Sequence, residues 1–217
     1  MIHKDIRNAI IKSQHCQRNW DLSKGICEED MALLETAVTQ CPSKQNIAFY
    51  KVHFITDRDL IEDIHDTTRG FTTTQHPSGA ETNTQALANL VVLFEMLDLE
   101  ETLKSDDVSR NEHSRSFLKD GWTESNQRQL KRDAYTAVGV ATGYLNVIAT
   151  MLGYSTGCCQ CYDAEQLQRI ACIKGEPLLL MGIGFSNEGV NRRKHQIRDD
   201  FMFSTKKKQP IVIERHV

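Results

Sequence analysis

The sequence predicts an α+β fold, in which helices outnumber a few short strands that lie far apart along the chain. Apolar residues recur at helical spacing over much of the sequence, and extended apolar runs occur near residues 48–55, 178–185 and 210–214. Strands separated this widely must pair through long connections. A composition of 40% hydrophobic and 25% charged residues is ordinary for one globular core, so residues 1–217 are expected to form a single domain.

The first part of the chain predicts two helices and a strand. Isoleucines at every fourth position indicate an amphipathic helix over residues 2–12. Acidic residues at 28–30 suit the positive end of a second helix, which is expected to end near Pro42 because the residue before proline is pushed out of helical geometry. Residues 48–55 are rich in Phe, Tyr, Val and Ile and are therefore expected to form a strand.

The next part predicts a short helix, a loop and a longer helix. The short helix is expected to begin at Asp57 or Asp59 and to run through Ile64. Residues 66–82 are rich in Thr, Gly, Ser and Pro, which is typical of a loop. Apolar residues then return at helical spacing, so a helix is expected over residues 83–97.

The second half is expected to contain the most apolar helix and a buried strand. Residues 100–132 are strongly polar, which favours a solvated loop or an exposed helix. Residues 134–152 predict a buried helix whose small residues allow close packing against a neighbour. Residues 178–185 predict a buried strand, and a short extended run covers residues 210–214.

Charge and hydrophobicity exclude several classes of protein. The net charge of −3 implies no general attraction to nucleic acids or anionic membranes, and two tryptophans in an aromatic content of 7% do not suggest a base-stacking surface. No stretch approaches the ~20 apolar residues of a membrane-spanning helix, and the polar N-terminus lacks the apolar segment of a signal peptide. We therefore expect a soluble, cytoplasmic protein without nucleic-acid or membrane partners.

The seven cysteines are expected to be mostly reduced, because their number is odd and no signal peptide precedes them. Cys158, Cys159 and Cys161 form a cluster that invites a metal-site interpretation. Zinc sites commonly use two separated Cys or His pairs, and no second pair accompanies this cluster. We expect no metal and favour small apolar packing. A metal-binding protein and a redox-sensitive pair with Cys16 remain alternatives.

Two polar clusters far apart in sequence are candidates for binding an organic phosphate. The first lies at or just beyond the end of the first helix, and the second follows the strand at 178–185. Arginine guanidinium groups bind phosphate through paired hydrogen bonds, so two such clusters can converge on one ligand. The alternative is that each arginine is a solvated surface charge. The two clusters comprise Gln14, His15, Cys16 and Arg18, and Arg192 and Arg193.

Four segments follow one another in a definite order along the chain. They are Gln14 to Arg18, Pro42-Ser43-Lys44-Gln45-Asn46, Gly157 to Asp163, and Pro177 to Phe185 followed by Arg192-Arg193. Together they resemble the nitroreductase family of flavoproteins, over residues 5 to about 200. In that family, a basic segment follows the first helix, a Pro-Ser-x-x-Asn segment comes next, a small-residue turn follows the long central helix, and a basic pair follows a late strand.

The resemblance implies a fold, a cofactor and a reaction. The fold would be a mixed or antiparallel sheet flanked by helices, in a homodimer that holds FMN at its interface. Hydride would pass from NAD(P)H through the flavin to a small organic acceptor, such as a nitroaromatic or a quinone, in ping-pong order. The cofactor carries the chemistry, so no protein side chain is expected to be catalytic.

The resemblance also implies roles for individual residues. Gln14, His15, Cys16, Arg18, Arg192 and Arg193 would contact the phosphate and ribityl chain. Pro42 and Ser43 would line the flavin ring from the partner subunit, and Asn46 would hydrogen-bond its polar edge. The backbone of Cys159 and Gln160 would face N5, where donors stabilise negative charge on the reduced ring. Phe49 and Phe117 are expected to line the acceptor pocket.

Departures from the family pattern motivate a second hypothesis. Gln14 stands where the family usually has arginine, and Cys16 stands where it has serine. A Gln amide donates hydrogen bonds but carries no charge. The alternative function is therefore a degenerate member that binds flavin or a partner protein without turnover.

Overall fold

The computed structural model describes residues 2–68, 82–108, 112–204 and 207–215. Within them, one sheet contains β1 (Tyr50–Ile55), β2 (Leu90–Met96), β3 (Ser155–Cys159) and β4 (Pro177–Gly184). The strand order is β1-β2-β4-β3, and each neighbouring pair is antiparallel. The central strands β2 and β4 are almost wholly buried. The expected α+β class and the strands near 48–55 and 178–185 are thus confirmed.

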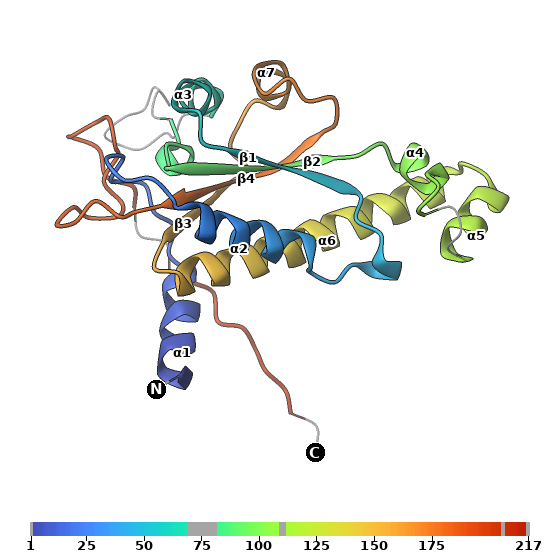
Figure 1. Cartoon of the computed structure of the whole chain (residues 1–217), viewed down its shortest axis with the longest axis horizontal. Coiled ribbons are helices and arrows are strands. Elements are labelled where there is room, and N and C mark those ends of the chain that lie inside the picture. Colours follow the sequence, from blue (N-terminus) through green and yellow to red (C-terminus); the bar gives the residue numbers. More distant parts are fainter. Residues whose placement is uncertain (1, 69–81, 109–111, 205–206, 216–217) are drawn as a thin grey trace.

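Helices cover both faces of the sheet (Figure 1). The long α6 (Glu124–Met151) and α2 (Glu28–Thr39) pack on one face, and α3 (Arg58–Asp66) and α7 (Ala164–Ile170) pack on the other. The larger core cluster fills the space between the sheet and the α2–α6 layer. A second cluster fills the space beneath α3 and α7.

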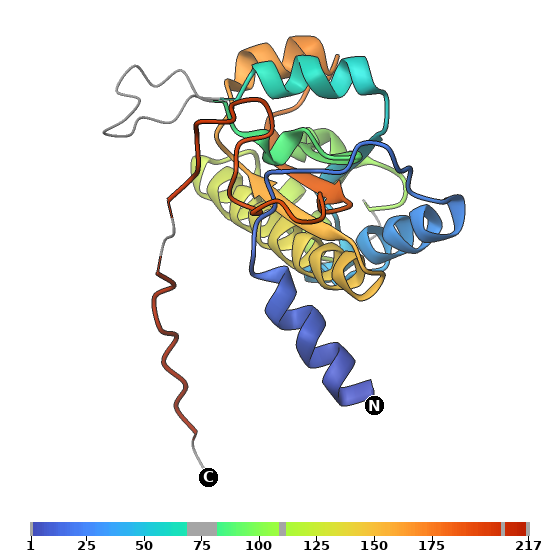
Figure 2. The ribbon, with the colours of Figure 1, turned by 90° about the vertical axis from the view of Figure 1, so that its left-hand side faces the viewer.

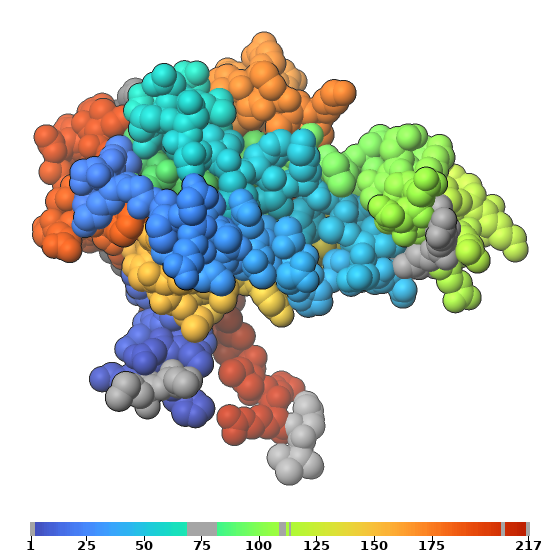
Figure 3. All heavy atoms as spheres, viewed as in Figure 1, coloured from blue at the N-terminus to red at the C-terminus, as the bar shows by residue number. Residues whose placement is uncertain are grey.

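The helix α1 (Ile2–Ser13) projects from the body of the molecule, as does the C-terminal segment 207–215 (Figures 2 and 3). The end of α1 is tied to the end of α6 by polar contacts. The Asn146 amide donates to the Ser13 carbonyl at 3.0 Å, and the Lys12 ammonium donates to the Gly153 carbonyl at 2.8 Å. These contacts fix where the chain enters the sheet region.

Local capping explains where the shorter helices begin. Asp57 accepts a hydrogen bond from the Leu60 amide at 2.8 Å at the start of α3, and Asp163 accepts one from the Gln166 amide at 3.0 Å at the start of α7. The expected helix start at Asp57 is therefore confirmed.

The predicted helix over residues 83–97 is wrong. This segment forms η2 (Thr84–Ala86), a short 3-10 helix, followed by β2. All residues of β2 are buried, because it lies at the centre of the sheet with helices on both faces. A strand buried on both faces is a continuous apolar run, which periodicity alone does not separate from a helix.

Other segments also differ from expectation. Residues 210–214 form no strand, and Ile211, Val212 and Ile213 are 76%, 82% and 79% exposed. Gly157, expected in a turn, lies in β3. The helix expected over 134–152 begins ten residues earlier, at Glu124, where the Thr123 hydroxyl caps it.

The polar region 100–132 contains exposed helices, which confirms one of the two structures expected for it. It includes most of α4 (Leu99–Lys104), α5 (Glu112–Asp120) and the start of α6. Most of the loop expected over 66–82 lies outside the described residues. Among the described residues, no helix has the length and apolarity needed to cross a bilayer.

Candidate functional site

The segment after α1 lies along the edge of β3. Cys16 forms an isolated parallel bridge with Thr156, and the Gln17 amide donates to the Thr156 carbonyl at 2.8 Å. Gly157 permits this approach, because a Cβ atom there would lie 2.9 Å from the Gln17 carbonyl oxygen. The absence of a side chain at Gly157 thereby allows the polar segment 14–18 to lie against the sheet.

The structure brings the two basic clusters together, although about 170 residues separate them in sequence. The Arg18 amide donates to the Arg192 carbonyl at 3.0 Å, and the Arg192 guanidinium donates to the Cys16 carbonyl at 3.1 Å. Figure 2 shows the loop that follows β4 crossing in front of the segment that follows α1. Arg18 and Arg192 therefore share one end of the molecule.

Arg18 is half-buried and lies over one aromatic ring. Its guanidinium carbon lies 4.5 Å from the centroid of the Phe203 ring, a cation–π arrangement. Burial lowers the pKa of Arg18, and the neighbouring Arg192 acts in the same direction. The Arg18 Nε atom is buried without a hydrogen-bond partner among the described residues. A half-buried cation whose buried Nε donor is unused suits an anionic ligand.

Arg193 belongs to the same loop but helps to hold it. Its guanidinium donates to the Phe203 carbonyl at 3.0 Å, and its own carbonyl accepts from the Phe203 amide at 2.9 Å. His195 stabilises the loop further, because its Nδ1 accepts from the amides of Ile197 and Arg198 at 3.2 and 3.0 Å. Sequence reasoning missed His195 and Phe203, since neither lies in a recognisable motif.

A cavity of about 440 Å³ lies beside this cluster. Its lining includes Lys12, His15, Gln17 and Arg192, together with residues 186–190 of the loop after β4. His15 and Gln14 are both exposed, while Cys16 is half-buried. Of the predicted clusters, His15 and Arg192 line this cavity, and Gln14, Cys16 and Arg18 are their neighbours in sequence or in the backbone contacts described above.

In the cysteine cluster, Cys159 is buried, while Cys158 and Cys161 are partly buried. Burial raises the pKa of Cys158 to about 12 and that of Cys159 to about 11. The Cys159 sulfur accepts a hydrogen bond from the Asn83 amide at 2.8 Å. All seven cysteines are free. In the part of the chain that the structure describes, no three His, Cys, Asp or Glu side chains gather as a metal site requires.

The end of β3 is fixed by side-chain contacts. The Gln160 amide donates to the Leu178 carbonyl at 3.1 Å, and the Cys161 backbone amide points to the Cys159 sulfur at 3.4 Å. Cys159 is itself 2% exposed. The backbone at Cys159 and Gln160 is therefore held in place at the side of the sheet that carries Arg18.

Pro42, Ser43 and Asn46 lie elsewhere in the molecule. They follow α2, and η1 (Lys44–Asn46) includes Asn46 in a left-handed conformation with φ of 59°. The Lys44 ammonium anchors this turn to Asp133 at 2.7 Å. A helix of α2's length spans about 18 Å. Figure 1 shows η1 at the far end of α2 from the Arg18 segment, so one chain does not bring the two groups together.

The two phenylalanines expected in an acceptor pocket contact the core instead of a described cavity. Phe49 is 2% exposed and belongs to the larger core cluster. Phe117, in α5, is partly buried against the same cluster. Their contribution to an acceptor pocket stays a prediction.

The family model for the nitroreductase family matches residues 11–185. Among solved structures, a nitroreductase of Exiguobacterium sibiricum in complex with FMN is 16% identical, with a TM-score of 0.63 over 88% of this chain and 91% of that one. A nitroreductase of Bacillus subtilis is 15% identical, with a TM-score of 0.68 over 94% and 100%.

An enone reductase of gut-bacterial fatty-acid saturation is 15% identical, with a TM-score of 0.60 over 86% of this chain and 90% of that one. No curated protein matches the chain in sequence. At these identities, the solved structures show a shared fold. The family model covers most of the chain and shows its ancestry: this protein belongs to the nitroreductase family.

Proposed function

We propose that this protein is an FMN-dependent oxidoreductase that passes hydride from NAD(P)H to a small organic acceptor in ping-pong order. The observation that carries this proposal is the convergence of Arg18 and Arg192 beside β3, where Arg18 keeps a buried donor without a partner. The presence of FMN in the Exiguobacterium sibiricum structure supports the choice of cofactor.

Arg18 and Arg192 would hold the phosphate, with His15, Gln14 and Cys16 close to the ribityl chain. Arg193 holds the loop that carries Arg192, because its guanidinium bonds to the Phe203 carbonyl. The backbone at Cys159 and Gln160 would face the reactive edge of the ring. FMN, when bound, supplies the site that accepts and releases hydride. The residues of the chain would therefore position the flavin and the substrate and exclude water from the site.

A homodimer would complete the site. Pro42, Ser43 and Asn46 lie at the far end of α2 from Arg18, so a second copy must supply them if they are to meet the same flavin. The surface of α6 supports pairing, because Tyr135, Tyr144 and Met151 are about half exposed. Sedimentation of the purified protein tests this arrangement: a mass near twice that of the chain is expected, and a monomer at micromolar concentration would contradict it.

The absorbance spectrum of the purified protein tests the cofactor and the reaction together. We expect a flavin spectrum that bleaches when NAD(P)H is added anaerobically and returns when a quinone or a nitroaromatic follows. A protein that contains no flavin and takes up no added FMN would contradict the proposal.

Substitution of Arg18 tests the phosphate site. Arg18→Gln removes a charge-assisted contact of about 1.5–3 kcal/mol, so FMN affinity should fall by roughly tenfold or more. Arg128→Gln is the matched control, because Arg128 is exposed and pairs with Glu124 on α6. Equal FMN affinities in the two variants would remove Arg18 from the site.

The second candidate is a member that binds flavin without turnover. Gln14 and Cys16 favour it, since they replace residues that the family usually places near the phosphate. Stoichiometric FMN that is not reduced by either NADH or NADPH would support this candidate. Steady NAD(P)H oxidation with any acceptor would exclude it.

A further inference from the structure

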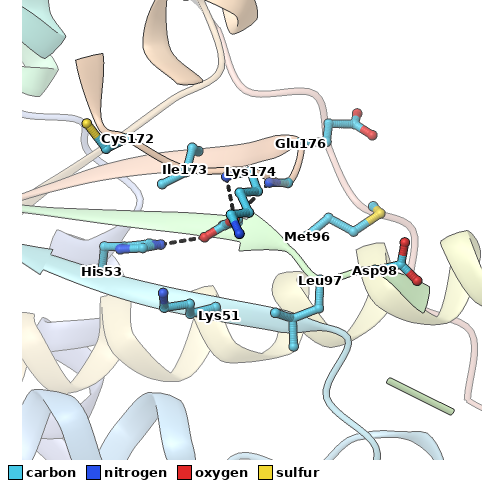
Figure 4. Close-up of a pocket in the computed structure, with 11 residues that line it drawn as sticks. Lys51, His53, Met96, Leu97, Asp98, Cys172, Ile173, Lys174 and Glu176 are labelled. Carbon is cyan, nitrogen blue, oxygen red and sulfur yellow. Dashed lines mark hydrogen bonds and ion pairs between the residues drawn. The ribbon is translucent and has the colours of Figure 1, made fainter. Parts of the chain in front are cut away.

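A second cavity lies away from the proposed flavin site. Its volume is about 650 Å³, and it is lined by the ends of β1 and β2 and by the loop 172–176 (Figure 4). None of its lining residues belongs to the cluster around Arg18. The proposed function gives this cavity no role.

A buried carboxylate organises the floor of the cavity. Glu95, on β2, is 6% exposed and accepts three hydrogen bonds. Its Oε1 accepts from the backbone amides of Lys174 and Gly175 at 3.0 and 2.7 Å, and its Oε2 lies 2.7 Å from Nε2 of His53. Glu95 therefore fixes both the loop 172–176 and the His53 ring.

The loop 172–176 has an unusual backbone that places it over the sheet. Cys172 adopts a left-handed conformation with φ of 51°, and the register between β2 and β4 shifts at Glu95. A Cβ atom at Gly175 would overlap the carbonyl oxygen of Met96. Bulges and left-handed non-glycine residues are enriched beside functional sites, because they redirect side chains at a local cost in energy.

Opposite charges gather at opposite ends of the cavity. Figure 4 shows Lys51, His53 and Lys174 toward one end, and Asp98 and Glu176 toward the other. Both lysines are exposed, and no hydrogen bond or ion pair joins either ammonium group to a described residue. Met96 and Leu97 lie between the two ends. At the first end, the two lysine ammonium groups outnumber the one carboxylate of Glu95, so that end keeps a net positive charge. The other end is acidic, and the middle is apolar.

Hydrogen bonds hold the carboxylates of Asp98 and Glu176 in place at the acidic end of the cavity. Asp98 caps α4 by accepting the Glu101 amide at 2.8 Å, and Glu176 accepts the Tyr135 hydroxyl at 3.3 Å. A ligand with a negative group at both ends would meet repulsion at this acidic end. A ligand with a carboxylate at one end and an ammonium group at the other would match both ends.

We propose that this cavity binds a small zwitterion of the amino-acid type, with its carboxylate toward Lys51, His53 and Lys174 and its ammonium group toward Asp98 and Glu176. Both charged ends contribute to affinity, and the apolar middle accommodates the carbon chain. Glu95 contributes by holding the His53 ring and the backbone of Lys174 on one side of the ligand.

A ligand titration, followed through the NMR signal of the His53 ring, tests the proposal. The protein is labelled with ¹³C-histidine and saturated with FMN, and the His53 ring signal is assigned by its absence in His53→Gln. The probes are 6-aminohexanoate, hexanoate and hexylamine at constant ionic strength and pH. We expect a saturable shift with 6-aminohexanoate at a concentration at least fivefold lower than with either single-charged probe.

Variants at each end provide the second measurement. The double variant Lys51→Gln/Lys174→Gln should weaken 6-aminohexanoate binding by roughly tenfold, and Glu176→Gln should weaken it several-fold. Lys131→Gln, an exposed lysine on α6, should leave it unchanged. A shift that does not saturate, equal binding of hexanoate, or equal binding in the double variant and the Lys131→Gln control would each overturn the proposal.

Discussion

The guanidinium group of Arg18 stacks on the ring of Phe203, with 4.5 Å between the guanidinium carbon and the ring centroid. Phe203 is itself fixed, since its backbone exchanges two hydrogen bonds with Arg193. The late loop therefore supports Arg18 as well as contributing Arg192. The phosphate site that we propose depends on a residue that lies ten positions beyond the last of the family's recognisable segments.

Phe203→Leu should weaken FMN binding without unfolding the protein. The variant keeps an apolar side chain but loses a cation–π contact of about 1 kcal/mol, so the dissociation constant should rise roughly fivefold. Quenching of FMN fluorescence measures it. Phe201→Leu is the matched control, because Phe201 contacts Phe203 and His195 in the same loop. A larger loss of affinity in the control would refute the role of Phe203.

Gly157→Ala should separate flavin affinity from stability. A Cβ atom 2.9 Å from the Gln17 carbonyl oxygen would push the segment 14–18 away from β3. The free energy of FMN binding should therefore weaken by more than the free energy of unfolding falls. Gly139→Ala, inside α6 with nothing within 4 Å of its Cβ, should instead raise the free energy of unfolding by about 0.5–1 kcal/mol. Urea unfolding and FMN titration of both variants check the contrast.

Glu95→Gln should lower the free energy of unfolding by about 1–3 kcal/mol, because an amide cannot satisfy the three donors that the carboxylate accepts. Burial alone would raise the pKa of Glu95, but the donors from Gly175, His53 and Lys174 outweigh it and lower the pKa. This stabilisation is present above the ordinary Glu pKa and is lost as pH falls through the lowered value. Urea unfolding at pH 7 measures the change, and equal stability of the variant and the parent would contradict it.

His65 should make the protein less stable in mild acid. Burial is the main cause that lowers its pKa to about 4, and its Nε2 has no hydrogen-bond partner in the described chain. The unfolded chain takes up a proton near pH 6.5, whereas the folded chain does so only near pH 4. The free energy of unfolding should therefore fall between these values, by on the order of 2–3 kcal/mol.

His65→Leu tests this effect, because it removes the titrating group and keeps an apolar volume. Urea unfolding between pH 7 and pH 4.5 should show a flatter dependence in His65→Leu than in the parent. His15→Gln is the control, since His15 is exposed. An unchanged slope in His65→Leu would assign the acid sensitivity to other groups.

The sequence predicted the elements whose patterns are local. The α+β class, the strands expected at 48–55 and 178–185 and the helix start at Asp57 followed from periodicity and capping residues. The central strand β2 did not, because burial on both faces removes the alternation that distinguishes a strand from a helix. The segment 210–214 has strand-like composition, but a strand needs a neighbour, and composition does not supply one.

The candidate site was predictable where charge and motif coincide. Arg18 and Arg192 were expected to converge, and the structure places them in contact through the backbone. The aromatic support from Phe203 and the fixing role of His195 were not predictable, because both depend on how the late loop folds back. The His53–Glu95 pair was likewise hidden, since the residues lie on different strands and meet only through the register of β1 with β2.

The length of α2 has a consequence for how defects combine. In the proposed dimer, Arg18 of one subunit and Asn46 of the other contact each flavin, so neither subunit contains all the residues of one site. A homodimer of an Arg18 variant would be inactive, and so would a homodimer of an Asn46 variant. Co-expressed, the two variants would form mixed pairs with one intact site and one doubly damaged site, so two defective alleles would complement each other.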